Sequence, residues 1–241
     1  MKATREDQQS LIDLLVIDRE LGKLNYALST LPVYGELEAA ESALGAHKKQ
    51  AAVRASGTTA IEKTMAECGV KVEQLNASIE RKQGQLDSGE NMDSRQLLVL
   101  QGEIDGLKGT RDEVEMAELE AMQELETLEE LIEADKNETE RFTEVRDGLA
   151  ARKAQEVADL EEQIAEVRSR RGALAATIAV DVVEAYDESR SMGGAGIVIM
   201  KTDGTIDGGM DLSVTEIEKV RALPEDEVYL TEDTGSLVVK A

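Results

Sequence analysis

The chain has 241 residues, of which 32% are charged and 2% are aromatic, and it contains no tryptophan. A compact core is hard to fill without large rings, so this composition is typical of long helices or a coiled coil and argues against a globular enzyme. The formal net charge of −24 repels phosphate backbones and disfavours general nucleic-acid binding.

A first helix is predicted over residues 4–31. Thr4 is suited to the N-cap, and apolar residues follow at alternating three- and four-residue intervals, which is the pattern of a coiled-coil seam. Proline disfavours a helical residue before it but is accepted in the first turn of a new helix, so we expect a kink at Pro32. The seam positions are Leu14, Ile17, Leu21, Leu24, Leu28 and Leu31.

A second helix is predicted over residues 33–87, where apolar residues recur every seven positions from Leu37 to Leu86. Small and polar side chains make the seam thin around residues 45–60. His47 lies in this part without a second metal ligand nearby, so we favour packing or solvent exposure over a ligand role. Cys68, the single cysteine, excludes an intramolecular disulfide framework, and its seam position favours a buried structural thiol over a reactive one.

The next segment, residues 88–93, combines glycine, asparagine and capping residues, which predicts a helix stop followed by a helix start. It reads as the tip of a hairpin. A third helix is then predicted over residues 94–190, with a seam that resumes at Leu97 and ends at Ile178. Residues 1–190 should therefore form a long antiparallel coiled-coil hairpin.

Residues 191–241 change character and predict a small α+β module. The glycines of residues 193–196 indicate a hinge, and strands are expected at residues 197–200, 228–230 and 237–239. Ser213 and Glu216 form a capping box that opens a short helix. A module of this size has little core of its own, so it relies on a few apolar residues and on docking against the root of the hairpin.

The chain resembles the bacterial C4-type zinc-ribbon, coiled-coil protein family, in which a long helical hairpin carries a small C-terminal ribbon. The resemblance covers nearly the whole sequence, and the order of tip, hinge and ribbon is its most specific part. The matching segments are residues 31–32, 86–89, 94–104, 115–122, 193–196, 226–228 and 234–239.

The resemblance implies four zinc-ligand positions, which in the family read as two C-x-x-C turns. Here Thr205, Gly208, Thr231 and Thr234 occupy them. These residues cannot hold zinc, so we expect a ribbon-like module that lacks metal, and no cofactor. The family implies adaptor or chaperone roles, some linked to flagellar or type III secretion components, and a nucleic-acid role inferred from the ribbon.

Two surfaces are candidates for partner binding. At the tip, the apolar residues cannot all face one partner helix, so they either close the hairpin or present a small binding patch. Residues 111–140 contain thirteen acidic and two basic residues, which form either a solvated face or a surface for basic segments of another protein. The candidate tip residues are Met92, Arg95, Leu97, Leu98, Val99 and Gln101.

We therefore predict a non-enzymatic adaptor, scaffold or chaperone-like protein that binds protein partners through the tip and the C-terminal module. The alternative is a nucleic-acid-associated protein of the zinc-ribbon family. No catalytic constellation or phosphate loop can be assembled from the sequence, and the lack of a signal peptide or long apolar run predicts a soluble, cytoplasmic protein without membrane insertion. Basic residues interrupt the seam where a second copy or a partner could complete the packing, at Arg54, Lys82, Arg111 and Arg171.

Overall fold

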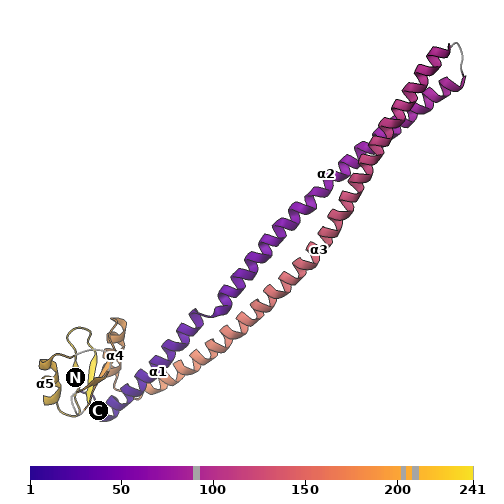
Figure 1. The fold of residues 1–241 in the computed structure, drawn as a ribbon. Coiled ribbons are helices and arrows are strands. Elements are labelled where there is room, and N and C mark those ends of the chain that lie inside the picture. Colours follow the sequence, from indigo (N-terminus) through magenta and orange to yellow (C-terminus); the bar gives the residue numbers. More distant parts are fainter. Residues whose placement is uncertain (89–92, 202–204, 208–211, 241) are drawn as a thin grey trace. The chain divides into compact units, whose positions relative to one another are not determined.

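The computed structural model describes residues 1–88, 93–201, 205–207 and 212–240. Helices dominate these ranges, and short strands gather in the last fifty residues (Figure 1). The mainly α prediction, a long helical hairpin followed by a small module with strands, is confirmed. The elements are α1 (Arg5–Ser29), α2 (Pro32–Ser88), α3 (Ser94–Ala175), α4 (Val180–Ser191), β1 (Ile197–Met200), β2 (Ile206–Asp207), α5 (Val214–Ala222), β3 (Tyr229–Leu230) and β4 (Leu237–Lys240).

The chain packs as two compact units. Residues 1–34 and 152–241 form one, which we name the sheet unit, and residues 35–151 form the other, the hairpin unit. This grouping differs from the predicted boundary between residues 190 and 191. The difference arises because α1 and the end of α3 pack with the C-terminal strands rather than only with each other.

Local sequence signals determine where the first two helices begin. The side chain of Thr4 accepts a hydrogen bond from the backbone N–H of Asp7, whose carboxylate accepts from the backbone N–H of Thr4, so a complete capping box opens α1. The helix ends at Ser29, and α2 begins at Pro32. Proline lacks only an N–H that would be unpaired there anyway, and the predicted break at this position is confirmed.

The single helix predicted over residues 94–190 is wrong, because α3 ends at Ala175 and α4 starts at Val180. Ile178, in the intervening turn, is 5% exposed and belongs to the core of the sheet unit together with Val182. The backbone N–H of Ala179 donates to the Asp7 carboxylate at 3.1 Å. Burial of Ile178 thus stabilises a break between α3 and α4, although residues 176–179 contain neither proline nor glycine.

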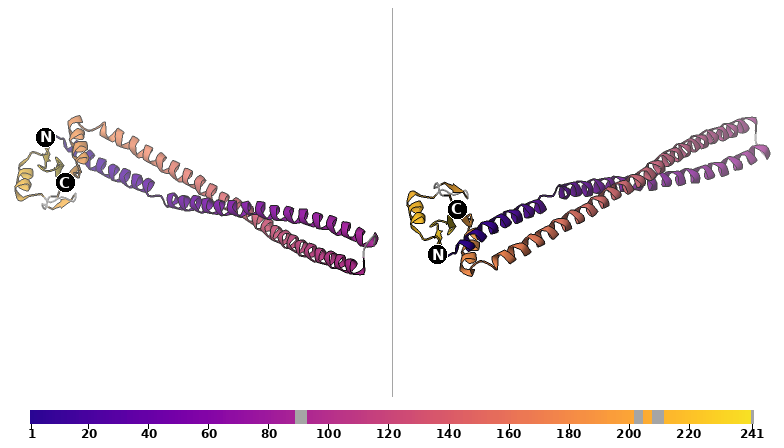
Figure 2. Two further views of the ribbon diagram at one scale, coloured as in Figure 1. Left: turned by 90° about the horizontal axis from the view of Figure 1, so that it is seen from above. Right: turned by 90° about the horizontal axis from the view of Figure 1, so that it is seen from below.

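The hairpin unit consists of the paired stretches of α2 and α3. Both views of Figure 2 show these helices side by side and crossing one another. Next to the tip, Ile79 of α2 packs with Leu100 and Ile104 of α3, and Leu86 and Leu107 extend this cluster. The three central residues are at most 9% exposed, as expected of seam positions.

Polar contacts replace apolar packing in the thin part of the seam. The guanidinium of Arg54 on α2 donates to both carboxylate oxygens of Asp135 on α3. This hydrogen bonding lowers the pKa of Asp135. His47 is packed here as predicted, with Nε2 3.1 Å from the Asp135 carbonyl oxygen and its ring 5.3 Å from that of Phe142. Cys68 is buried, in agreement with the sequence.

The sheet unit is built on a four-stranded sheet of order β2-β1-β4-β3, in which β1 and β4 run parallel and the outer strands pair antiparallel. Side chains alternate between its two faces. Ile197, Leu237 and Val239 face a core shared with α1 and α4. Val198 and Val238 face a second core that includes Val220 of α5. Both faces of the sheet are therefore covered.

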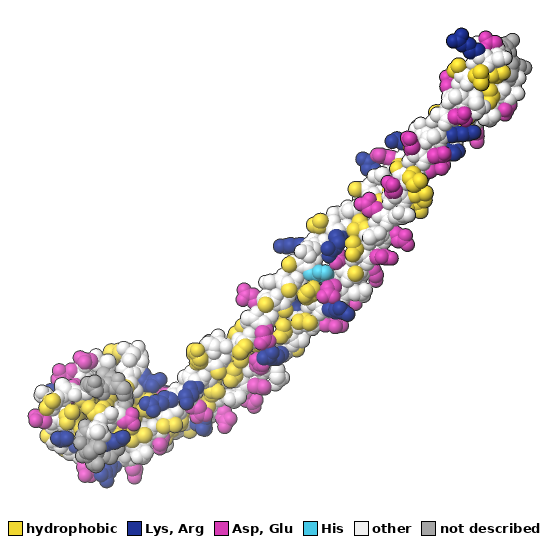
Figure 3. Space-filling view, in the orientation of Figure 1, with side chains coloured by type: hydrophobic (Ala, Val, Ile, Leu, Met, Phe, Trp, Pro, Cys, Tyr) yellow, Lys and Arg dark blue, Asp and Glu magenta, His cyan; other side chains and the backbone are white. Residues whose placement is uncertain are grey.

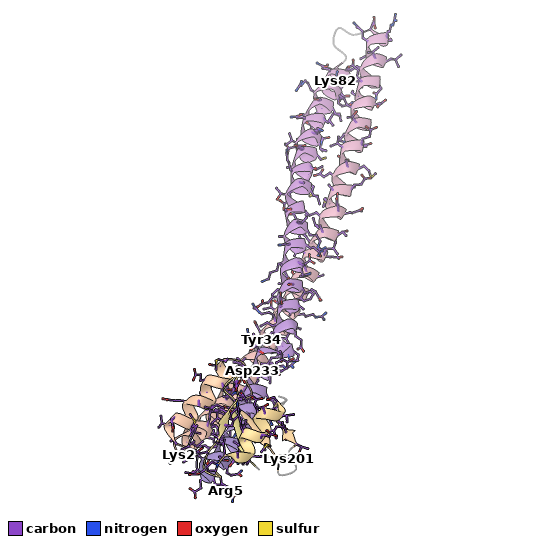
Figure 4. The ribbon with its side chains drawn as sticks, turned by 90° about the vertical axis from the view of Figure 1, so that its left-hand side faces the viewer. Lys2, Arg5, Tyr34, Lys82, Lys201 and Asp233 are labelled. Carbon is purple, nitrogen blue, oxygen red and sulfur yellow. The ribbon has the colours of Figure 1, made fainter. Side chains whose placement is uncertain are left out.

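The first residues of the chain join this unit, which the sequence did not indicate. Lys2, which is labelled in Figure 4, forms an isolated antiparallel β-bridge with Glu227. The backbone N–H of Val228 donates to the carbonyl of Met1 at 2.9 Å. The Gln8 side chain donates to the carbonyls of Ala3 and Glu225 at 2.9 and 2.8 Å. Residues before α1 are thereby fixed to the segment before β3.

The glycines after α4 form a close-packed turn. Gly193 and Gly196 have φ angles of 85° and 77°, which L side chains rarely adopt. A Cβ at Gly196 would lie 2.5 Å from the ring of Tyr186, and one at Gly194 would lie 2.5 Å from Oγ of Ser189. The predicted hinge is thus a turn in which glycine is required by backbone geometry and by contact with α4.

Candidate functional site

The tip residues follow a well-defined start of α3. Asp93 Oδ1 accepts from the backbone N–H of Gln96 at 2.8 Å, and Gln96 Oε1 accepts from the N–H of Asp93 at 2.8 Å. This reciprocal cap fixes the direction of the first turn of α3. The candidate Met92 lies outside the described residues.

The remaining tip candidates divide into an outer and an inner set. Leu98 and Val99 are 74% and 58% exposed, and Arg95 is also exposed. Leu97 is half-buried, and Gln101 donates to Asp105 of its own helix at 2.9 Å. Because Leu100 and Ile104 point toward α2, their neighbours Leu98 and Val99 must point away from it. We name Arg95, Leu98 and Val99 the tip surface.

Close to the tip, one ion pair joins the two helices. Lys82 of α2, labelled in Figure 4, binds the carboxylate of Glu103 on α3. This contact, together with the Ile79, Leu100 and Ile104 cluster, supports the helix that carries the tip surface. A helix that is already ordered loses little backbone freedom on binding, which suits its exposed side chains to recognition.

In the C-terminal module, two of the predicted ligand positions belong to a chain of hydroxyl groups. Thr231 Oγ1 lies 3.3 Å from Thr234 Oγ1, which lies 2.9 Å from Ser236 Oγ. Ser236 Oγ lies 2.9 Å from Ser189 Oγ of α4, and the N–H of Ser236 donates to Thr231 Oγ1 at 2.9 Å. These hydrogen bonds connect the turn between β3 and β4 to α4.

The other two of these positions are Thr205 and Gly208. The carbonyl of Thr205 accepts from the N–H of Lys201 at 2.8 Å, and Gly208 lies outside the described residues. Within the described ranges, no group of three or more histidine, cysteine, aspartate or glutamate side chains is arranged to hold a metal ion. Hydroxyl groups that bond one another hold the β3–β4 turn.

The basic residues that interrupt the seam bind carboxylates of this chain. Lys82 and Arg54 pair across the two helices, as described above, and Arg171 pairs with Asp18. Arg111 differs, because its partners Asp112 and Glu115 are on its own helix. All four basic residues thus form ion pairs within the chain, and whether a second copy or a partner completes the packing there stays a prediction.

A buried polar network in the sheet unit was missed by the sequence analysis. Arg171 donates to both oxygens of Asp18, at 2.6 and 3.2 Å, and also binds Asp187. Tyr186 donates to Asp18 at 2.8 Å. Burial, reinforced by the nearby Asp18, raises the pKa of Tyr186, so its hydroxyl stays a donor. The sequence signal that could have indicated this network is Asp18, an acidic residue on the same helix as the buried leucines of α1.

Among the helices in the described ranges, none combines the length and the apolar character needed to cross a lipid bilayer. The acidic run of residues 111–140 lies within α3, and most of its carboxylates are exposed.

Comparisons with known proteins agree with this architecture. Residues 14–194 match the family model of the CT398-like coiled coil hairpin domain. A structure characterised from Mycobacterium smegmatis is similar over 100% of both chains, with 19% identity and a TM-score of 0.80. CT398 from Chlamydia trachomatis is similar over 98% of both chains, with 12% identity and a TM-score of 0.66.

The HP0958 protein from Helicobacter pylori is also similar over 98% of both chains, with 17% identity and a TM-score of 0.50. At these identities the likeness shows a shared fold. No curated protein matches the sequence.

Proposed function

The chain belongs to the CT398-like coiled coil hairpin domain family, and from this premise we propose that it is a non-enzymatic adaptor or chaperone-like scaffold that binds protein partners. The tip surface is the main contact, and the C-terminal module provides a second one. We also propose that the C-terminal module is related to zinc ribbons and has lost the four zinc ligands. The residues at those positions are Thr205, Gly208, Thr231 and Thr234.

The observation that carries the proposal is the exposure of Leu98 and Val99 on a capped and supported helix. Two adjacent large apolar side chains in water are unfavourable unless a partner covers them. Arg95 on the same surface adds a donor that is common in protein interfaces.

Buried polar groups support a structural rather than a catalytic use of the interior. In the described ranges, each buried polar or charged side chain has a hydrogen-bond partner that connects it to another part of the chain or to a turn. Groups that are fully engaged in this way stabilise the fold. Function is therefore assigned to exposed surfaces. The buried polar residues are Gln8, Asp18, Asp135, Ser189, Thr231 and Ser236.

Site-specific photo-crosslinking in cells tests the proposal. A photoreactive residue is placed at Leu98 or Val99, and at Val53, which is 72% exposed on α2, as a matched control. We expect discrete protein adducts from the tip positions and none of the same adducts from Val53. Identical adducts from all three positions would show that the tip has no special role.

The alternative function, association with nucleic acid, is examined with the same protein. Labelled RNA or DNA is titrated at physiological ionic strength, where a chain of net charge −24 should not bind. A salt-dependent shift that is lost when residues 191–241 are removed would favour the alternative over the adaptor.

A further inference from the structure

The hairpin unit contains a groove, lined by apolar and acidic side chains, that has no part in the proposed tip surface. It has a volume of about 440 Å³ and lies where Met65 of α2 meets α3. Its apolar lining continues along α3, and two carboxylates flank it. We name it the Met122 groove, and the residues used here are Met65, Leu119, Met122, Leu125, Glu126 and Glu129.

The groove exists because the seam at this level is narrow. The buried seam residues are Cys68 of α2 and Ala121 of α3, which are 8% and 7% exposed. With such small side chains in the centre, larger apolar groups lie beside the seam instead of inside it. Leu119 and Met122 are consequently 53% and 48% exposed. Methionine adapts its shape easily, which suits a surface that accepts a helix.

The surroundings of the groove are strongly acidic. In residues 111–140, the two basic residues Arg111 and Lys136 bind acidic neighbours on α3. Eight other glutamates of this run have no cationic partner among the residues that the structure describes. On the face shown in Figure 3, hydrophobic and acidic side chains lie next to one another along this unit. The eight are Glu113, Glu118, Glu120, Glu124, Glu126, Glu129, Glu130 and Glu140.

We propose that the Met122 groove docks a basic amphipathic helix of a partner protein. Apolar side chains of that helix at i, i+3, i+4 and i+7 pack on Leu119 and Met122, while its lysines or arginines lie against Glu126 and Glu129. The groove follows α3 from residue 119 to residue 129, which is roughly 15 Å, so it holds about three helical turns.

Charge selects this occupant over a second copy of the chain. A net charge of −24 makes two acidic hairpins repel each other, and the acidic rim repels them locally. An apolar helix without positive charge would cover the groove floor but would leave Glu126 and Glu129 without an opposite charge. A helix with one apolar and one basic face satisfies both parts of the surface.

The test uses the full chain and a labelled peptide of about 18 residues, with leucine at helical spacing on one face and lysine elsewhere. Binding is followed by fluorescence anisotropy at two salt concentrations. The charge variant Glu126→Gln/Glu129→Gln is compared with Glu120→Gln/Glu124→Gln, which changes the net charge equally at exposed positions outside the groove. The apolar variant Met122→Ser is compared with Met116→Ser, because Met116 is 59% exposed and lies outside the groove.

We expect each groove variant to weaken peptide binding about tenfold and each matched control less than about twofold. Equal losses from the two charge variants would mean that the peptide binds the acidic surface without using the groove, and would overturn the proposal. Equal losses from the two methionine variants would do the same. Far-UV circular dichroism verifies that all four variants retain their helices.

This inference is independent of the tip. The variant Leu98→Ser/Val99→Ser, which removes the apolar side chains of the tip surface, should bind the peptide as the unchanged chain does. Loss of peptide binding in that variant would contradict a separate groove site. Sedimentation of the chain alone checks the other occupant, because self-association abolished by Met122→Ser would assign the groove to a second copy.

Discussion

The hydroxyl of Tyr186 donates a 2.8 Å hydrogen bond to Asp18, a residue 168 positions earlier in the chain. The same carboxylate binds Arg171, so one side chain of α1 holds α3 and α4 at once. Tyr186 is fully buried and Asp18 is 6% exposed. This contact fixes α4 after the unexpected end of α3, and with it the direction in which the chain enters β1.

Removal of the shared carboxylate should destabilise the sheet unit strongly. Asp18→Ala leaves Arg171 and the Tyr186 hydroxyl without their buried acceptor, and we expect a loss of about 2–4 kcal/mol in the free energy of unfolding. Chemical denaturation followed by tyrosine circular dichroism measures it. Glu20→Ala is the control, because the Glu20–Arg170 pair is half-exposed and should contribute less than about 1 kcal/mol. Similar losses in both variants would contradict a central role for Asp18.

The turn after α4 should not tolerate a side chain at Gly196. Gly196→Ala combines a φ of 77° with a clash against the Tyr186 ring, so we expect a loss of more than about 2 kcal/mol. Gly193→Ala has a similar φ of 85° but open space around the added methyl, and should lose only about 1 kcal/mol. Denaturant titrations of both variants measure the difference, and equal values would show that the close contact is unimportant.

The long helices should gain stability where glycine is not required. Gly106 lies inside α3, and a methyl group added there would meet no neighbouring side chain within 4 Å, so Gly106→Ala should raise the free energy of unfolding by about 0.5–1 kcal/mol. Gly57→Ala is the matched comparison on α2, because its methyl would lie 3.3 Å from Leu128. Thermal unfolding measures both. A stabilisation at Gly57 as large as that at Gly106 would show that α2 and α3 separate easily there.

The cap of α5 gives a dependence on pH. The backbone N–H and the hydroxyl of Ser213 donate to Glu216 and lower the pKa of its carboxyl from the ordinary 4.5. The resulting stabilisation is fully present above pH 4.5 and is lost as the pH falls through the lowered pKa. Glu216→Gln should therefore be less stable than the unchanged chain by a few tenths of a kcal/mol near pH 7.

At acid pH the two proteins should become equally stable, since the unchanged carboxyl is then protonated. Thermal unfolding of Glu216→Gln and of the unchanged chain, near pH 7 and at acid pH, measures the difference in stability at each pH. A difference that stays constant with pH would assign the effect to shape and not to charge. Ser213→Ala provides a reference, because loss of the whole cap should cost about 1 kcal/mol.

Sequence patterns predicted those elements whose signals are local. Thr4 marked the start of α1, Pro32 the start of α2, and Ser213 with Glu216 the cap of α5. The sequence also indicated that the apolar residues at the tip cannot all face one partner helix, but it did not identify Leu98 and Val99 as the exposed pair.

Features that depend on distant contacts were not predictable in the same way. The end of α3 depends on the burial of Ile178 among side chains from α1 and the sheet. The bridge between Lys2 and Glu227 joins segments with no shared pattern. The Met122 groove results from small side chains at Cys68 and Ala121, whose positions fit a regular seam and give no warning of a depression beside it.

The position of α1 in the sheet unit also affects biosynthesis. Leu11 and Leu14 are fully buried, yet their core partners begin at Ile178 and end at Val239. At ordinary translation rates, roughly ten to forty-five seconds pass before the ribosome has delivered all of those partners. Until then the apolar face of this early helix stays uncovered in the nascent chain, so the growing polypeptide is exposed to aggregation or chaperone capture for most of its synthesis.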